Sequence, residues 1–326
     1  MHHQLIPLLR ILSDGKFHAG SELAQQLDIS RATVCNALKS ASDVGIRLYK
    51  VQGRGYQMPV IPDWLDATQI RAGLRGEASG FTIEIVDSIE STNTALLRAP
   101  EPATHRHCLL AEYQHAGRGR RGRSWLASLG GSVTCSVRWR FQQGIGALAG
   151  LSLAVGVALL RCLDALGARD LKLKWPNDLL WQDRKLAGIL IEVQGEANGP
   201  SVAIIGIGIN LRLPDSLRNT IEQPVTDLTE AIGHPVARNA LLSDLLNALD
   251  TVMREFEASG LSQLRHEWSA AHAHAGQTLQ VTLANGHLIT GAACGLTPWG
   301  ALLLQDDNGA EIAVHSGDVQ LARKAS

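Results

Sequence analysis

Apolar residues in the first 40 positions recur at helical spacing. Residues 5–12 place leucines on one helical face, and Ser21 and Ser30 each stand where a side chain caps a further helix. In the third helix, Val34 and Leu38 are four positions apart and share the face that we expect to be buried. The pattern therefore predicts three short helices, the last two joined by a tight turn.

A short hairpin follows these helices. Residues 48–51 and 56–58 are strand-like and flank a glycine-containing turn, which predicts a β-wing. This layout is a winged helix-turn-helix and favours DNA binding over the alternative use in protein contacts. Seven Lys or Arg against four Asp or Glu give residues 1–58 a net charge of +3, and the rest of the chain carries −4. The expected DNA-contacting side chains lie on the third helix and the wing: Arg31, Thr33, Asn36, Lys39 and Arg54.

Residues 63–272 show both strand-like alternation and helical periodicity, which predicts one mixed α/β unit. Apolar and polar side chains alternate over 132–141, as in a half-buried strand, and again over 171–175. The apolar runs 186–193 and 202–211 are joined by a turn, so we expect an antiparallel pair. Helices are expected at 92–98, 147–166, 238–257 and 261–270.

The last fifty residues change to short strands. A hairpin with the type I′ signal Asn285-Gly286 is expected between 278–283 and 288–293, with further strands at 301–304 and 311–314. We therefore expect a small β-barrel after the mixed α/β (α+β) core. The predicted domains are 1–62, the winged helix-turn-helix; 63–272, the central domain; and 273–326, the barrel.

Composition excludes several classes of protein. With 30 Lys plus Arg against 31 Asp plus Glu, the net charge is −1, so bulk charge does not hold this chain on nucleic acid or membranes. Five cysteines without a CxxC pair argue against a disulfide framework and a cysteine-rich zinc site, and they fit the cytoplasm. The first residues lack a signal-peptide pattern. The uncharged stretch 141–160 is long enough to span a bilayer, but its small residues favour a buried helix and no membrane contact.

The most informative segment is rich in glycine and arginine: Gly117-Arg118-Gly119-Arg120-Arg121-Gly122-Arg123-Ser124-Trp125. Its glycines match GxGxxG, but no helical pattern follows and no acidic residue occurs between Glu112 and Asp164, which argues against a dinucleotide-binding turn. Arginine supplies planar donors for phosphate or carboxylate, and glycine lets the backbone approach a ligand. A lid over an anionic ligand is therefore favoured over an RNA-binding or targeting run.

This loop resembles the signature loop of the biotin protein ligases. Four more segments match that family in the same order, so the resemblance covers essentially the whole chain: Ser91-Thr92-Asn93, Lys174-Trp175-Pro176-Asn177-Asp178, Lys185-Leu186-Ala187-Gly188-Ile189-Leu190-Ile191-Glu192 and Gly206-Ile207-Gly208-Ile209-Asn210. The N-terminal part is similar to that of the bifunctional bacterial ligases, which also repress the biotin operon. The resemblance implies a biotin- and ATP-binding catalytic domain related to class II synthetase folds, and an SH3-like barrel. It also implies that biotin and MgATP form biotinyl-AMP, from which biotin passes to a lysine of a carboxyl carrier domain.

The resemblance implies roles for individual residues as well. Lys185 and Arg120 are the expected catalytic cations, because joining two anions requires stabilised charge at the carboxylate and the α-phosphate. The expected biotin-binding residues are Ser91, Thr92, Asn93, Gln114, Gly117, Arg118, Gly119, Arg120, Lys185, Gly188 and Gly206. The expected ATP or adenylate residues are Arg121, Arg123, Trp125, Lys174, Asn177, Asp178 and Asn210, and Asp178 is also the candidate for holding Mg²⁺ indirectly.

Several of these residues have simpler interpretations. Ser91 has an equal claim as the cap of the helix at 92–98, and residues 176–178 as a plain turn. Two His-x-His pairs, at 105–107 and 272–274, lack a third ligand, so we expect surface histidines. The sequence also departs from the family, because Val225 stands where repressor-type ligases have a tryptophan over the adenylate.

The resulting hypothesis is a cytoplasmic bifunctional protein. Its expected partners are the biotin carboxyl carrier protein of acetyl-CoA carboxylase, operator DNA of biotin synthesis genes, and a second copy of itself once the adenylate is bound. One alternative is a ligand-sensing transcription factor without catalysis, which the complete basic loop and Lys185 disfavour. The other is a lipoate-type protein ligase, which the winged helix and the arginine run disfavour.

Overall fold

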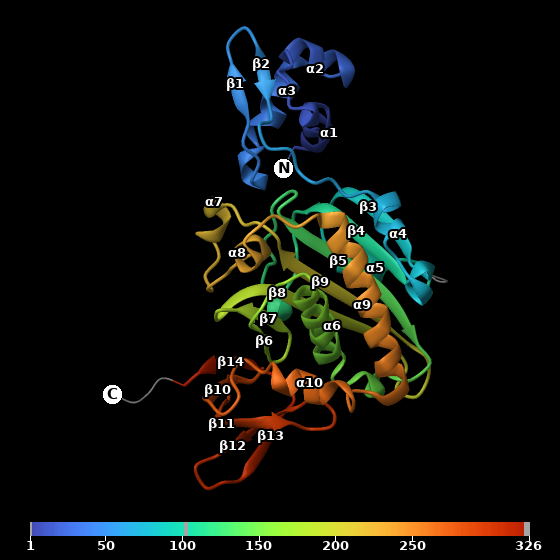
Figure 1. Ribbon diagram of the computed structural model, residues 1–326, viewed down its shortest axis with the longest axis vertical. Coiled ribbons are helices and arrows are strands. Elements are labelled where there is room, and N and C mark those ends of the chain that lie inside the picture. The colour runs from blue at the N-terminus through green and yellow to red at the C-terminus, as the bar shows by residue number, and fades with distance from the viewer. Residues whose placement is uncertain (1, 101–103, 323–326) are drawn as a thin grey trace.

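The computed structural model describes residues 2–100 and 104–322. Figure 1 shows a small helical part with a hairpin at one end, a large sheet covered by helices in the middle, and a small strand-rich part at the other end. The expected mixed α/β class, with a winged helix-turn-helix before it and a small β domain after it, is confirmed.

The N-terminal part begins as the sequence predicts. Its elements are α1 (Leu5–Ile11), α2 (Gly20–Gln26), α3 (Arg31–Lys39) and an antiparallel hairpin of β1 (Tyr49–Val51) and β2 (Gly55–Gln57). The Ser30 hydroxyl caps α3 by accepting a 3.0 Å hydrogen bond from the Thr33 N–H, as predicted. The predicted cap at Ser21 is wrong, because α2 already begins one residue earlier. Backbone hydrogen bonds between His18 and Tyr56 hold the chain just before that helix and set its start.

Seven strands form the central sheet, in the order β3-β4-β5-β9-β8-β7-β6. β3 and β4 are parallel, and the other neighbouring pairs are antiparallel, including the predicted hairpin of β8 and β9. The strands are β3 (Thr82–Ile89), β4 (His107–Gln114), β5 (Ser132–Phe141), β6 (Leu171–Lys174), β7 (Asp178–Trp181), β8 (Arg184–Gly195) and β9 (Ser201–Asn210).

Helices cover both faces of this sheet. α6 and α9 pack on one face and α5 on the other, so β5 is buried on both faces rather than half-buried as predicted. The helices of the central part are α4 (Ala67–Ala72), α5 (Thr92–Arg98), α6 (Leu151–Ala165), α7 (Asp215–Arg218), α8 (Leu228–Ile232), α9 (Arg238–Ser259) and α10 (Leu264–Ala270). The short helices α4, α7 and α8 were not predicted.

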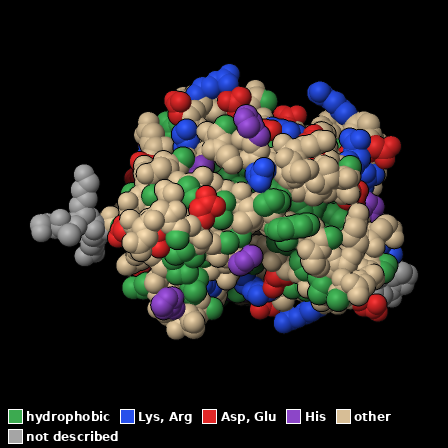
Figure 2. All heavy atoms as spheres, turned by 90° about the horizontal axis from the view of Figure 1, so that it is seen from below, with side chains coloured by type: hydrophobic (Ala, Val, Ile, Leu, Met, Phe, Trp, Pro, Cys, Tyr) green, Lys and Arg blue, Asp and Glu red, His purple; other side chains and the backbone are tan. Residues whose placement is uncertain are grey.

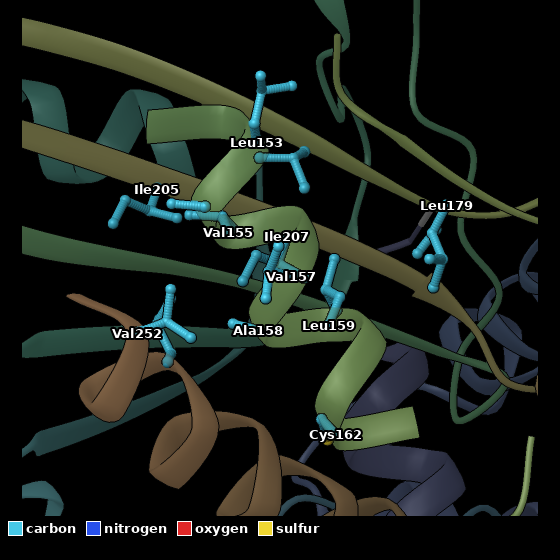
Figure 3. Close-up of a cluster of buried hydrophobic side chains, with 14 of the residues drawn as sticks. Leu153, Val155, Val157, Ala158, Leu159, Cys162, Leu179, Ile205, Ile207 and Val252 are labelled. Atoms are coloured by element: carbon cyan, nitrogen blue, oxygen red, sulfur yellow. The ribbon is translucent and has the colours of Figure 1, made fainter. Parts of the chain in front are cut away.

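α6 is the central helix of the core. The stretch Ile145–Ala165, which contains α6, is long and apolar enough to cross a membrane by length and composition. In the structure its side chains pack among residues of β9 and α9, such as Ile205, Ile207 and Val252 (Figure 3). This burial agrees with the helix predicted to lie against a sheet.

A five-stranded antiparallel sheet forms the C-terminal part, in the order β13-β12-β11-β10-β14. Its strands are β10 (Thr278–Thr282), β11 (Leu288–Leu296), β12 (Leu302–Gln305), β13 (Glu311–Val314) and β14 (Asp318–Leu321). The predicted type I′ turn is wrong, because only Gly286 has a positive φ, of 82°, and Asn285 does not. A three-residue loop, closed by a 2.9 Å hydrogen bond from Leu283 N–H to His287 O, makes the turn instead. Seen from this end, the surface carries basic and acidic side chains with hydrophobic ones between them (Figure 2).

His272 and His274 are buried, and the expectation of surface histidines is wrong for this pair. They lie between α10 and the C-terminal sheet, where Ala273 N–H donates a 2.9 Å hydrogen bond to Leu173 O of β6. The ring centroids of His272 and Trp268 are 4.8 Å apart, so the imidazole packs as an aromatic core residue. Burial lowers the pKa of His272 to about 4, and the pKa of His274 is lowered for the same reason.

The central part contributes to the core of the winged helix. Leu129 is buried in that core, and its N–H donates a 3.0 Å hydrogen bond to Val44 O. Arg10 of α1 forms a 2.7 Å ion pair with Asp87 of β3. The winged helix therefore sits on the segment that directly follows the arginine-rich loop.

Candidate active site

A strip of small residues forms the floor of the site. Along β9, Ile205, Ile207 and Ile209 enter the core, while Gly206, Gly208 and Asn210 point to the opposite face. In the sheet, Gly208 pairs with Gly188 of β8 on one side and Thr134 of β5 on the other. The bare strip makes room for the indole of Trp125, because a Cβ on Gly208 would lie 2.4 Å from that ring.

A network of buried polar side chains stands at one end of this floor. Asn93 donates to Leu190 O at 3.1 Å and to Glu192 Oε2 at 3.0 Å, and its Oδ1 accepts from the Ser136 hydroxyl at 2.5 Å. A Cβ on Gly206 would lie 2.2 Å from that Oδ1. The close approach that Gly206 permits is therefore to Asn93, a side chain of the protein itself.

Two further predicted residues join this network at the carboxyl ends of the parallel strands β3 and β4. The Thr92 N–H donates to Gln114 Oε1 at 2.7 Å, and the Thr92 hydroxyl lies 2.6 Å from the Ser136 hydroxyl. Ser91 caps α5 by accepting from the Thr94 N–H at 3.4 Å, so its simpler interpretation is confirmed. Short hydroxyl and amide groups thus line a compact, fixed wall suited to a ligand with both donors and acceptors.

The arginine-rich loop folds over the floor as a narrow hairpin. Trp125 N–H donates to Gly117 O at 2.8 Å, and Gly119 N–H donates to Arg123 O at 2.7 Å. At the tip, Gly122 has a φ of 73°, which glycine adopts without strain. The backbone therefore holds the loop closed at its base while the arginine side chains extend from it.

Three of the four loop arginines meet carboxylates. Arg118 forms a 3.0 Å ion pair with Glu192 of β8. Arg121 and Arg123 share Asp318 of the C-terminal sheet, at 2.9 and 2.7 Å. Neither acidic residue was predicted as part of the site.

Arg120 is different, because within residues 2–100 and 104–322 it has no carboxylate partner. It donates a 3.2 Å hydrogen bond to Asn177 Oδ1, and burial lowers its pKa from the ordinary value. Burial likewise lowers the pKa of Lys174, to which no ion pair is assigned in the described ranges. Two partly desolvated cations, to which no ion pair is assigned in the described ranges, favour the binding of an anion nearby.

Lys185 lies at the start of β8 and pairs with Asp178 at 2.8 Å. Its backbone N–H donates to Pro224 O at 2.9 Å, and its carbonyl accepts from Thr226 N–H at 3.0 Å. These bonds place buried Val225 beside the lysine. The Asn210 side chain donates to Thr226 O at 3.0 Å and braces the same segment.

Two adjoining cavities connect these groups. The smaller, of about 100 Å³, is lined by the polar wall with Thr92, Gln114 and Ser136. The larger, of about 750 Å³, is lined by Lys174, Asn210 and the segment 220–225. The residues that line both cavities are Arg120, Arg123, Ser124, Trp125, Asn177, Asp178, Lys185, Gln223 and Asp318.

The two sets of site residues predicted from the sequence therefore converge on one region. Gly117 and Arg121 line an adjoining hollow. Every other predicted site residue lines at least one of the two cavities. Sequence reasoning missed Ser136, Glu192 and Asp318. Ser136 could have been found, because the alternation over 132–141 places it on the polar face of β5. Asp318 could not, because it lies in a short strand without a motif.

The expected DNA-contacting residues lie together on the winged helix. Arg31, Asn36 and Lys39 are exposed on α3. The Thr33 hydroxyl is engaged with the capping Ser30 at 2.9 Å, and the Arg54 guanidinium in the hairpin lies 4.1 Å from the centroid of the Phe17 ring. A hollow of about 530 Å³ separates α3 from the hairpin.

Comparison with known sequences gives three matches along the chain. The Biotin/lipoate A/B protein ligase family matches residues 85–210, an HTH domain matches 5–57, and the Biotin protein ligase C terminal domain matches 274–322. The bifunctional ligase/repressor BirA of Escherichia coli is 34% identical over 96% of this chain and 98% of its own length. The biotin--[acetyl-CoA-carboxylase] ligase of Mycobacterium tuberculosis is 33% identical over 78% of this chain and 95% of its own.

The fold also matches a solved structure. The biotin protein ligase from Aquifex aeolicus in complex with biotin and ATP superposes with a TM-score of 0.63, over 74% of this chain and 99% of that one, at 23% identity. That likeness supports the overall architecture of the fold. The similarity over nearly the full length to the bifunctional relative of Escherichia coli shows that the chain belongs to the family of biotin protein ligases that are also transcriptional repressors.

Proposed function

We propose that this protein activates biotin with ATP as biotinyl-AMP, transfers biotin to a lysine of a biotin carboxyl carrier domain, and represses biotin synthesis genes. The observation that carries the ligase part is the position of Lys185 and Arg120, which line both cavities. A ligand that reaches from the smaller cavity into the larger one passes these two cations. That is where a carboxylate and an α-phosphate must meet.

Biotin fits the smaller cavity by its functional groups. Its ureido ring offers one acceptor and two donors, which suit the wall of Ser91, Thr92, Asn93 and Gln114. Its carboxylate then points toward Arg118, Arg120 and Lys185, past the backbone of Gly119 and Gly188, while Gly206 and Gly117 contribute indirectly, by making room for Asn93 and for Trp125. The adenylate occupies the larger cavity, beside Lys174, Asn177, Asn210 and Trp125, within reach of Arg121 and Arg123.

The chemistry needs positioning and charge rather than a nucleophile of the protein. A biotin carboxylate oxygen attacks the α-phosphorus and pyrophosphate leaves; the acceptor lysine then attacks the acyl carbon and AMP leaves. Lys185 exchanges Asp178 for the two anions and stabilises the charge that grows between them. Arg120 supports the same charge and, with the loop, keeps the intermediate from escaping.

Mg²⁺ is expected to arrive with ATP. Magnesium binds through one or two carboxylates together with substrate phosphates and water. Asp178 fits this use, because its buried Oδ1 has no hydrogen-bond donor within the described part of the chain apart from the ion pair with Lys185. The ion would neutralise the leaving pyrophosphate.

The repressor part rests on the winged helix with its exposed Arg31, Asn36 and Lys39. We propose that a two-fold operator is bound by a dimer formed once the adenylate is in place. Among the described residues, the stretch 190–195 of β8 has a strand partner, β9, on one side only, and Val193 is exposed there, which favours pairing with a second copy. We also propose domain boundaries at 62 and 272, and a cytoplasmic location.

Incubation with biotin, MgATP and a biotin carboxyl carrier domain tests the ligase proposal. We expect pyrophosphate release, biotinyl-AMP bound to the protein, and one biotin added per acceptor domain. Biotin binding without pyrophosphate release would support the sensor without catalysis. Transfer of lipoate in preference to biotin would support the lipoate-type ligase.

A further inference from the structure

Glu192 connects the wall of the smaller cavity to the arginine-rich loop. Its Oε2 accepts from Asn93 Nδ2 at 3.0 Å and from Arg118 NH1 at 3.3 Å, while its Oε1 lies 3.0 Å from Arg118 NH2. The carboxylate therefore engages Arg118 through both oxygens and holds an amide of the wall with one of them. Such a two-point arrangement fixes direction as well as distance.

The residues on either side of Glu192 are themselves fixed. Asn93 is 3% exposed and its remaining amide N–H and its oxygen are used by Leu190 and Ser136. Arg118 NH1 also lies 3.3 Å from the Thr94 hydroxyl on α5. Glu192 therefore links the position of Asn93 to that of Arg118. A ligand that displaces Asn93 also displaces the loop through this carboxylate, and a movement of the loop displaces Asn93 in turn.

We propose that Glu192 is a positioning residue that couples occupation of the biotin wall to closure of the loop. Glu192 is not among the residues that line the two cavities assigned to biotin and the adenylate, so it acts through Asn93 and Arg118. This role deepens the proposed ligase function and rests on it for the identity of the ligand. The contact between Glu192 and the loop, however, is made by groups of the protein itself.

The variant Glu192→Gln separates the charge from the shape. Glutamine keeps the size of the side chain and an oxygen for Asn93, but it places no negative charge against Arg118. The matched control is Glu196→Gln, which removes a carboxylate that is exposed four positions further along the chain. Equal thermal unfolding of both variants and the parent establishes that the fold is intact.

The first measurement needs no ligand. Trypsin cleaves after arginine, so the rate of cleavage within 118–123 reports how often the loop opens. We expect Glu192→Gln to be cleaved about two- to fivefold faster than the parent, as a partly exposed ion pair allows, and Glu196→Gln to be unchanged. Equal rates for all three proteins would overturn the inference.

The second measurement uses biotin. We expect Glu192→Gln to raise the biotin dissociation rate and the biotin KM by about the same two- to fivefold, with kcat at saturating biotin unchanged. In an Arg118→Gln background the same substitution should add nothing. A fall in kcat at constant KM, or an equal effect in both backgrounds, would overturn the coupling. Absence of biotin binding in the parent would instead contradict the proposed function and leave the cleavage result standing.

Discussion

Arg123 of the arginine-rich loop donates a 2.7 Å hydrogen bond to Oδ2 of Asp318, the first residue of β14. The same oxygen accepts from Arg121 at 2.9 Å, so two cations of the loop share one carboxylate of the C-terminal sheet. The C-terminal part therefore takes a direct share in closing both cavities.

Asp318→Asn should loosen the loop without changing the fold of the C-terminal sheet. Partly exposed ion pairs contribute about 0.2–1 kcal/mol each, so we expect biotinyl-AMP to leave the enzyme roughly two- to tenfold faster. Release of labelled adenylate in a chase experiment measures this rate. Asp307→Asn, in an exposed turn of the same sheet, is the control. An equal effect of both substitutions would show that the ion pairs of Asp318 do not specifically hold the loop.

Gly206→Ala should weaken biotin binding by displacing Asn93. The added Cβ would lie 2.2 Å from Asn93 Oδ1, a contact that cannot persist, so the buried amide loses hydrogen bonds worth about 1 kcal/mol each. We expect at least a tenfold rise in the biotin dissociation constant by titration calorimetry. Gly146→Ala meets no atom within 4 Å and should leave that constant unchanged. Unaltered binding in Gly206→Ala would show that Asn93 does not shape the wall.

The buried His272 predicts a loss of stability in mild acid. Its pKa of about 4 lies below the ordinary 6.5, so the folded state disfavours the proton and the full contribution to stability is present above pH 6.5. As the pH falls from 6.5 toward 4, the free energy of unfolding should drop by up to roughly 1.4 kcal/mol per pH unit from this group. His272→Phe keeps a ring against Trp268 and should flatten the pH dependence measured by urea unfolding. The exposed His287→Phe should not, and identical pH profiles for His272→Phe and the parent would contradict this assignment.

Arg31→Ala should weaken DNA binding and leave biotin transfer intact, because Arg31 is exposed on α3 and lines neither cavity. A lost base contact costs about 1–3 kcal/mol, and a lost phosphate contact lowers the salt dependence of binding by about one ion. Fluorescence anisotropy with operator DNA at several salt concentrations distinguishes the two. Arg169→Ala removes an exposed cation of the central part and controls for bulk charge. If Arg31→Ala lost ligation as well as DNA binding, the assignment of these two activities to separate parts of the chain would be contradicted.

Much of this structure could be predicted from local patterns. The apolar run 202–211 predicts the strand that the structure has at 201–210, and Gly206 and Gly208 of this strand form part of the floor of the site. Ser30 as a helix cap and the pairing of β8 with β9 depend on neighbours in sequence, and both are confirmed. Local spacing carries such features because the interacting groups are a few residues or one turn apart.

Features that depend on distant contacts escaped prediction. The start of α2 is set by pairing with β2, not by Ser21, and the imidazole of His272 is buried by Trp268 and by the C-terminal sheet. Asp318 and Arg123 of the loop are 195 positions apart in the sequence, so no pattern within either segment indicates their ion pair. The turn at Asn285 was mistaken because the dipeptide signal does not specify whether the loop has two residues or three.

The central claim is that Lys185 stabilises charge during adenylate formation, and the variant Lys185→Ala tests it most directly. Removing one preorganised donor typically costs roughly 100- to 1000-fold in rate, and the polar wall with Thr92 and Gln114 keeps hold of biotin. Lys172→Ala, an exposed lysine on β6, is the control. Single-turnover formation of biotinyl-AMP at saturating biotin and MgATP should therefore slow by that order in Lys185→Ala, with a much smaller change in biotin affinity. An unchanged chemical rate with weakened biotin binding would show that Lys185 is only a binding residue and would contradict the account.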